Sequence, residues 1–333
     1  MSQKQKQAIQ VVVSLVLALW IFWFLYKDIE FDSLSTQVRD SKWSWIFASL
    51  FIALVGFWLR AWRWTLLITK DEGKVVSVSR AFHALMVGYL TNLLIPRAGE
   101  VARCGMLNRS NGVSLGHLLG TVILERTVDL AFLIGTIALA FFVERSRFID
   151  LSGQLINVDQ LIESSLDNMP IIVGGFFIFL FFIYFLFRRF QDHRLINKAQ
   201  HFFREIWTGL KTIGTLKNPI GFWTSSLALW IIYFFTMYFV AFAIESTANL
   251  SPGEVLLVMV MGSIGMVAPV QGGIGTFHAL VAFILIQFGI TEQDGKIFAA
   301  IIHGTQMLLM IVVGLISWFW MVRIKPWSKP PIA

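Results

Sequence analysis

The chain contains 333 residues, of which 56% are hydrophobic and only 14% are charged, with a formal net charge of +7. This composition leaves too little polar surface for a soluble domain and indicates an integral membrane protein, in which basic residues between apolar stretches set the topology rather than bind nucleic acid. The single cysteine, Cys104, excludes a disulfide framework, and no Cys/His spacing fits a metal or redox motif, so we expect neither a metal nor another cofactor.

Six apolar stretches are long enough to cross a bilayer, which takes about 20 residues of helix. The first follows Lys4 and Lys6 and lacks a small-x-small cleavage site, so we expect an uncleaved helix rather than a signal peptide. The predicted spans are 8–26, 43–69, 117–143, 170–187, 222–244 and 297–322.

The charges of the connecting segments predict how these spans are oriented. Residues 188–221 and the C-terminal tail are basic, whereas residues 144–168 are mostly acidic. Because basic segments stay on the cytoplasmic side, we expect both termini and the 188–221 loop in the cytoplasm and the acidic segment outside.

Two further apolar regions, about 80–108 and about 254–290, fit a straight span badly. The first contains PRAGEVAR at 96–103 and the second PVQGGIGT at 269–276, and proline and glycine end helices. Together with the loop charges, this predicts two re-entrant helical hairpins that open on opposite sides, the first to the cytoplasm. Non-helical backbone at such depth is tolerated only where protein buries it or where it lines a wet cavity.

A span, a hairpin and a span occur twice, at about 43–143 and about 222–322, with opposite predicted orientation. Inverted repeats with broken helices are a recurrent transporter design, and a helix N-terminus at the break attracts an anion such as a phosphate. The alternative is that the glycines only allow tight helix crossings. The predicted fold is therefore an all-α polytopic membrane protein, with a single transmembrane domain over 1–333.

Charged residues inside the span 117–143 form the first candidate site. Glu125, Arg126 and Asp129 lie near its middle, where an unpaired charge costs roughly 2.5 to 3.5 kcal/mol. Glu125 and Asp129 share a helix face, with Arg126 about 100° around the helix. The cluster is either functional or an ion-pair network that holds helices together.

Arginines and polar residues elsewhere add further candidates. Arg60 and Arg63 are flanked by tryptophans, which favours interfacial anchoring, with guidance of an anionic headgroup by the deeper Arg60 as the alternative. Around the first glycine turn, the forked guanidinium groups of the arginines suit a phosphate. Simple anchoring of these side chains at the membrane interface is an equally open alternative. The remaining candidates are Arg97, Glu100 and Arg103 at the first turn, Gln271, Gly272, Gly273 and Thr276 at the second turn, and His278, His303 and Gln306 as polar cavity residues.

Four motifs in this order are LRAWRW (59–64), PRAGEVAR (96–103), ILERTVDL (123–130) and APVQGGIGTFHAL (268–280). The set resembles that of the lysylphosphatidylglycerol synthase transmembrane-region family of flippase-like membrane proteins. The resemblance implies an all-helical domain of the bacterial inner membrane that moves or presents aminoacylated phosphatidylglycerol or lipid-linked intermediates. The positions that match the family motifs are Arg97, Glu100, Arg103, Glu125, Arg126, Asp129, Gly272 and Gly273.

Some members of that family continue into a soluble aminoacyltransferase or glycosyltransferase domain, which these 333 residues do not contain. We therefore expect a lipid translocase rather than a synthase, with membrane lipids as its partners and a separate enzyme supplying the lipid. The sequence contains no Walker motif, so we do not expect ATP to bind to these residues through a P-loop. The alternatives are a membrane enzyme that acts on a lipid phosphate, with Glu125 or Asp129 as base, and a non-catalytic scaffold subunit.

Overall fold

The computed structural model describes Trp23 and residues 31–68, 76–95, 97–145, 216–268 and 270–327, and these residues form helices and short connections without a strand. The side chains of 31–34 and 271 are not described. The predicted span 170–187 and nearly all of 8–26 lie outside the described residues, as does most of the basic loop. Within the described part, the prediction of an all-α polytopic membrane protein is confirmed.

Two compact units divide the chain, residues 1–140 with 216–333 and residues 141–215, and only 141–145 of the second unit are described. In the first unit, a short helix α2 (Phe31–Asp40) precedes four helices that are long and apolar enough to cross a bilayer. These are α3 (Trp43–Leu67), α6 (Leu115–Val143), α11 (Pro219–Ala243) and α14 (Glu292–Arg323). They coincide with the predicted spans 43–69, 117–143, 222–244 and 297–322.

The outer faces of the long helices carry large apolar side chains that the described residues leave exposed. On α3 these side chains are three or four residues apart and therefore share one face; they are Phe47, Phe51, Val55 and Trp58. A similar row follows α14, at Leu308, Val312, Leu315 and Phe319. Such extended apolar faces suit hydrocarbon rather than water, so the chain is an integral membrane protein.

Between α3 and α6, the chain forms two shorter helices, α4 (Val78–Leu94) and α5 (Gly99–Asn111), which fold back on each other. The break between them contains Arg97 with a positive φ of 60°. It is stabilised by Asn92, whose Oδ1 accepts a hydrogen bond of 2.7 Å from the Gly99 N–H. The amide thus satisfies one of the backbone donors that the start of α5 exposes.

A second broken pair lies between α11 and α14, after the short turn η2 (Glu245–Thr247). It consists of α12 (Pro252–Val267), the 3₁₀ turn η3 (Gln271–Gly273) and α13 (Thr276–Gln287). The turn needs glycine because Gly272, Gly273 and Gly275 have φ of 59°, 73° and 88°, where side chains are strained. Helix-breaking sequence therefore produces a helix, break and helix at both predicted places.

Glycine also permits the close crossing of the helices within each pair. A Cβ at Gly99 would overlap the carbonyl oxygen of Gly88, and a Cβ at Gly265 would lie 2.7 Å from the Cα of Phe277. Small residues at these positions let the backbones touch. The crossing interpretation of the glycines thus holds at Gly88, Gly99 and Gly265, whereas Gly272 and Gly273 serve the turn.

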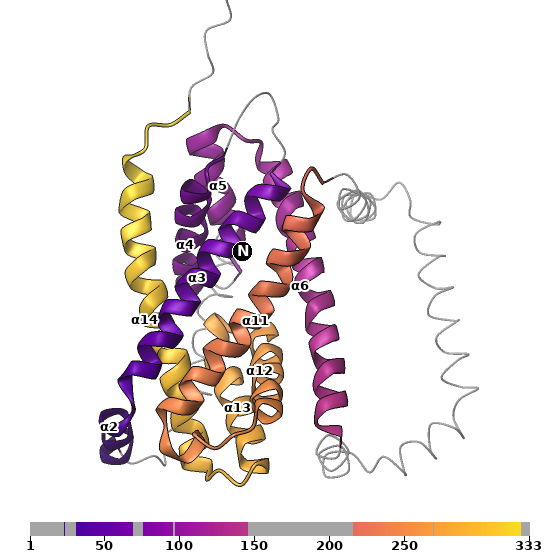
Figure 1. The fold of residues 1–333 in the computed structure, drawn as a ribbon. Helices are drawn as coiled ribbons and strands as arrows, with labels where there is room; N and C mark the ends of the chain where they lie inside the picture. The colour runs from indigo at the N-terminus through magenta and orange to yellow at the C-terminus, as the bar shows by residue number, and fades with distance from the viewer. Residues whose placement is uncertain are drawn as a thin grey trace, which may run out of the picture. The chain divides into compact units, whose positions relative to one another are not determined.

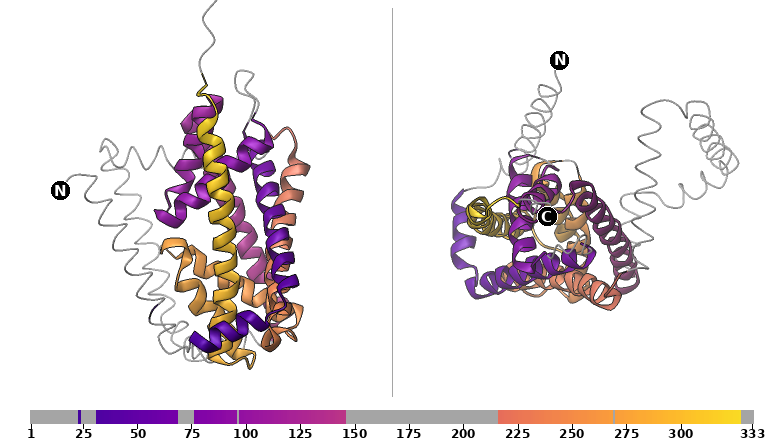
Figure 2. Two further views of the ribbon diagram at one scale, coloured as in Figure 1. Left: turned by 90° about the vertical axis from the view of Figure 1, so that its left-hand side faces the viewer. Right: turned by 90° about the horizontal axis from the view of Figure 1, so that it is seen from above.

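The two broken pairs enter the first unit from opposite ends, and their breaks meet between the long helices (Figure 1). The turn η3 packs against α4, and a Cβ at Gly272 would lie 3.5 Å from the Leu93 side chain. Viewed from above in Figure 2, α14, α3, α11 and α6 follow one another around the broken pairs. The breaks therefore lie between the long helices. Gly273 and Gly275 at the second break are buried, whereas Leu94, Ile95 and Arg97 at the first break are exposed.

The helix α6 is attached differently from the other long helices. Near its start, Leu118 joins a buried apolar core with Trp64 of α3, Leu85 of α4 and Leu107 of α5. Beyond this region α6 makes fewer close backbone approaches to its neighbours than α3, α11 or α14 do. Its middle part is therefore connected to the unit mainly through side chains.

Candidate functional site

Two arginines of α3 meet two carboxylates of α6 in the interior of the unit. Arg60 donates from Nε to Glu125 Oε1 at 2.9 Å and from Nη2 to Asp129 Oδ2 at 2.7 Å. Arg63 donates from Nη2 to Asp129 Oδ1 at 2.7 Å. The pairs match because residues three apart on α3 and four apart on α6 each lie on one helix face.

A third arginine reaches one of these carboxylates, Glu125, from α5. Arg103 Nη1 lies 3.2 Å from Glu125 Oε2, and its guanidinium lies 4.6 Å from the ring centroid of Trp64. The Trp64 Nε1 donates in turn to Thr121 Oγ1 at 2.9 Å. The stacked ring and the carboxylate together fix the orientation of the Arg103 fork.

The helix α11 closes the cluster with two hydroxyl groups. Arg60 Nη1 donates to the Tyr233 hydroxyl at 3.0 Å, and Arg63 Nη1 donates to Ser226 Oγ at 3.2 Å. We call Arg60, Arg63, Arg103, Glu125 and Asp129 the ionic cluster. It joins α3, α5 and α6 directly and α11 through the two hydroxyl groups.

The ionic cluster holds three guanidinium groups against two carboxylates, which leaves one positive charge in excess. The side chains of Arg63 and Glu125 are fully buried, and that of Arg103 is 3% exposed. Arg63 Nε and Arg103 Nη2 have no hydrogen-bond partner among the described residues. Buried donors are normally paired, so an unpaired donor beside an uncompensated charge makes the site suited to an anion.

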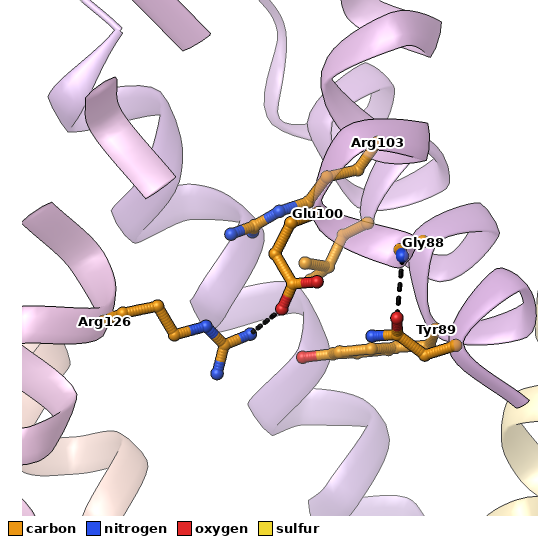
Figure 3. A pocket seen from close by; sticks show the side chains of 8 residues that line it. Gly88, Tyr89, Glu100, Arg103 and Arg126 are labelled. Carbon is orange, nitrogen blue, oxygen red and sulfur yellow. Dashed lines mark hydrogen bonds and ion pairs between the residues drawn. The ribbon is translucent and has the colours of Figure 1, made fainter. Parts of the chain in front are cut away.

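A small pocket lies beside Arg103, between α4, α5 and α6 (Figure 3). It has room for roughly one water molecule. Across it, Arg126 Nη2 and Glu100 Oε1 form an ion pair of 3.2 Å, with side chains 47% and 27% exposed. The pocket is lined by Leu85, Gly88, Tyr89, Asn92, Gly99, Glu100, Arg103 and Arg126.

The structure separates residues that the sequence grouped. Arg126 does not join Glu125 and Asp129 but pairs with Glu100, since it points about 100° away around α6. Of the three candidates at the first turn, Glu100 and Arg103 line the pocket, whereas Arg97 is exposed at the break. The two arginines of α3 do not act as interfacial anchors in the structure, because the side chains of both are buried in ion pairs.

The candidates of the second break form a separate group. Thr276 Oγ1 donates to the Gly265 carbonyl oxygen at 2.8 Å and so helps to hold α12 against α13. His278 and His303 are buried together, with ring centroids 4.9 Å apart. Gln306 lies one turn further along α14 and is partly buried, and the side chain of Gln271 is outside the described structure.

For three residues in or beside the ionic cluster, the sequence pattern did not predict the contacts that they make in the structure. Arg63 lies three residues after Arg60 and therefore shares its helix face. The spacing in the sequence already indicated that the two side chains point the same way. Ser226 and Tyr233 are seven residues apart, two helical turns, and this spacing in a mostly apolar helix could have indicated a polar face. Among the described residues, no group of three or more His, Cys, Asp or Glu side chains could hold a metal ion.

A family model described as the lysylphosphatidylglycerol synthase TM region matches residues 11–314. The chain belongs to this family. The match includes the ionic cluster and both broken helix pairs, and it confirms the resemblance carried by the four motifs. Membership in the lysylphosphatidylglycerol synthase TM-region family supports a lipid-related membrane function and contact with membrane lipids. Comparisons with curated proteins and with solved structures gave no match.

Proposed function

We propose that the protein is a lipid translocase that moves or presents an anionic or aminoacylated phospholipid, or a lipid-linked phosphate, between the leaflets of the bilayer. The observation that carries this proposal is the buried excess of positive charge in the ionic cluster, with an unpaired Arg103 donor beside the pocket. Intramembrane ionisable residues that face protein mark substrate pathways by default. The acyl chains would stay in the bilayer while the headgroup passes through the unit.

In this mechanism the arginines bind the lipid phosphate, and the carboxylates replace it when no headgroup is bound. Arginine forms paired, charge-assisted hydrogen bonds to phosphate oxygens, and Arg103 keeps one donor unused by Glu125. Glu125 and Asp129 lower the cost of burying the guanidinium groups in the empty state. A cationic aminoacyl headgroup could in turn approach Glu100, whose Oε2 has no partner among the described residues.

A headgroup can enter only if the unit opens, because the pocket has room for about one water molecule. The helix α6 is suited to this movement, since its middle part is connected to α3 and α5 mainly through charged side chains. Exchange of these ion pairs for contacts with a phosphate would shift the population toward the open conformation. Alternating exposure to the two leaflets would complete the transfer.

The membrane arrangement is part of the same proposal. We infer that α4–α5 and α12–α13 are re-entrant hairpins and that about 43–143 and 222–322 are inverted repeats within one domain. Support comes from the matching order of a long helix, a broken pair and a long helix, with 25, 17, 13 and 29 residues in one half and 25, 16, 12 and 32 in the other. The basic segments favour a bacterial cytoplasmic membrane with both termini inside.

The enzymatic alternative gains less support from the geometry. A general base must be free to accept a proton from a substrate. Glu125 lies within 4 Å of three arginines and Asp129 of two, so both carboxylates are engaged in ion pairs. The arrangement is better suited to hold an anion than to abstract a proton.

Replacing Arg103 with glutamine should slow the transfer of labelled phosphatidylglycerol by roughly tenfold or more, because it removes both the excess charge and the unused donor. The measurement is the leaflet distribution of a fluorescent lipid in reconstituted vesicles, read by quenching from outside. Arg109→Gln is the matched control, since this arginine lies on the same helix but is exposed and bonds the Val322 carbonyl oxygen.

Wild-type transfer rates in Arg103→Gln would contradict the assignment of the headgroup site. Analysis of the lipids after each assay separates the alternatives: an altered lipid would identify an enzyme, and neither transfer nor alteration by the wild-type protein would favour the scaffold. Lipids that co-purify with the protein, identified by mass spectrometry, would name the headgroup.

Arg126→Ala should fold normally but transfer lipid several-fold more slowly. Its ion pair with Glu100 is partly exposed, and solvent-screened pairs stabilise by only about 0 to 1 kcal/mol. Because Arg126 lines the pocket, its loss still weakens the approach of an anionic headgroup. Thermal unfolding and vesicle transfer measured on the same preparation check both parts, and a large loss of stability would show that Arg126 is structural instead.

A further inference from the structure

A pair of histidines lies outside the ionic cluster, where α13 packs against α14. His278 and His303 are only 4% and 6% exposed, and their ring centroids are 4.9 Å apart. Phe277 covers the His303 ring at 5.0 Å. Both imidazoles lie directly beside the second helix break, and the proposed headgroup site does not use either of them.

His278 stabilises the start of α13 through a ring nitrogen. The backbone N–H of Gly275 donates to His278 Nδ1 at 3.2 Å. A nitrogen that accepts a hydrogen bond carries no proton, so His278 is neutral in this conformation, with any ring proton on Nε2. The bond satisfies one backbone donor that the helix start exposes, as the third residue of a capping box does.

His303 is the unpaired member of the pair. Its ring faces the backbone of Gly272, but neither Nδ1 nor Nε2 completes a hydrogen bond with a described residue. A neutral imidazole always has one nitrogen that can accept a proton. An unpaired buried group of this kind beside a helix break calls for an explanation beyond packing.

Among the described residues, His303 is a titratable group that acts on His278. The turn η3 has no titratable side chain, and α13 has none besides His278. On α12, α14 and α4, the other titratable groups lie at helix ends or contact other partners. Those at helix ends are Asp294 in the first turn of α14, Arg323 in its last turn and Arg80 in the first turn of α4. Those with other partners are Glu254 with Ser251, Lys296 with Glu292, His83 with Ser317 and Tyr89 with Phe57.

We propose that His278 and His303 form a proton-binding site whose occupation opens the second helix break. A proton on either ring places a positive charge in a buried site beside the positive end of α13. A proton on Nδ1 of His278 also removes the acceptor of the Gly275 hydrogen bond. The protonated pair is therefore more stable where water reaches it, so acid shifts the equilibrium toward an open break.

This site gives the protein a coupling ion for transport. In the proposed arrangement the second hairpin opens to the outside of the cell, where an energised bacterial membrane is more acidic. Proton entry from that side would favour the outward-open conformation. The role of the proton as a coupling ion rests on the proposed function, whereas the acid-induced opening of the break does not.

Hydrogen–deuterium exchange of the full-length protein in lipid nanodiscs tests the opening directly. Amide exchange of residues 268–282 is measured at pH 7.5 and pH 5.0 and divided by the intrinsic exchange rate at each pH. We expect protection at the start of α13 to fall by roughly tenfold or more at the lower pH, while α11 keeps its protection. Equal protection at both values would overturn the proposal, and this comparison needs no variant.

Two substitutions and a control sharpen the test. His278→Gln keeps an acceptor for the Gly275 N–H but cannot titrate, so its break should stay protected at both pH values. His303→Gln should likewise reduce the response, whereas His83→Gln, a partly buried histidine that bonds Ser317, should leave it unchanged. A full response in both pair variants would overturn the site. Acid-induced opening in a protein that transfers no lipid would support the site and contradict the proposed translocase.

Discussion

Replacing Glu125 with glutamine should destabilise the protein by about 3 to 5 kcal/mol and abolish lipid transfer. Glu125 is fully buried and lies within 4 Å of Arg60, Arg63 and Arg103. Loss of its charge leaves three buried guanidinium groups with Asp129 as their remaining carboxylate in the cluster. A buried charge without a compensating partner lowers the free energy of unfolding. Thermal unfolding followed by tryptophan fluorescence and transfer in reconstituted vesicles measure the two effects.

A matched control and a second variant make this result specific. Glu292→Gln removes a carboxylate that is 67% exposed and pairs with Lys296 within one helix, so it should change stability by less than about 0.5 kcal/mol. The double variant Glu125→Gln with Arg103→Gln should be more stable than Glu125→Gln alone, because it also removes one unpaired positive charge. If the double variant were less stable by the sum of both single effects, the charge balance would not be the cause.

Gly99→Ala should destabilise the protein by about 3 kcal/mol or more, although alanine is the better helix former. The added Cβ would overlap the Gly88 carbonyl oxygen and lie 2.6 Å from Asn92 Cγ. Backbone cannot turn aside as a side chain does, so α4 and α5 would have to separate. Because Asn92 also bonds the Gly99 N–H, the first break would lose its support. Thermal unfolding checks the expected loss.

Gly105→Ala is the control for this substitution on the same helix. A Cβ at Gly105 meets nothing within 4 Å among the described residues, and the position is exposed. Helix propensity alone then applies, and we expect a gain of up to about 1 kcal/mol. Similar stability changes at Gly99 and Gly105 would show that the close crossing of α4 and α5 does not matter.

The fold was predictable to the extent that it follows from apolar length and helix breakers. Four predicted spans coincide with α3, α6, α11 and α14 because runs of apolar residues of that length have few other structures available in a membrane. The boundaries were less predictable. The helix α14 begins at Glu292 rather than at 297, since Thr291 caps a polar first turn that hydropathy alone does not include.

The candidate site was predictable only where it depends on spacing within one helix. Glu125 and Asp129 share a face as expected, and both face the interior. Their partners could not be deduced, because the contact with Arg60 joins residues 65 apart in the sequence and depends on how α3 packs against α6. The tryptophans beside Arg60 pointed to the membrane interface, but Trp64 stacks instead on Arg103 inside the unit.

The contact between the two breaks has a consequence for the order of events in the proposed lipid transfer. Gly272 of one break lies close to Leu93 beside the other, and η3 packs against α4. In the proposed arrangement, a displacement of η3 toward the outside would remove the support of α4 from one side only, and α4 would follow it and tighten the opposite entrance. We expect the two entrances to be open in turn and not together, which would keep protons and other small ions from leaking through the protein.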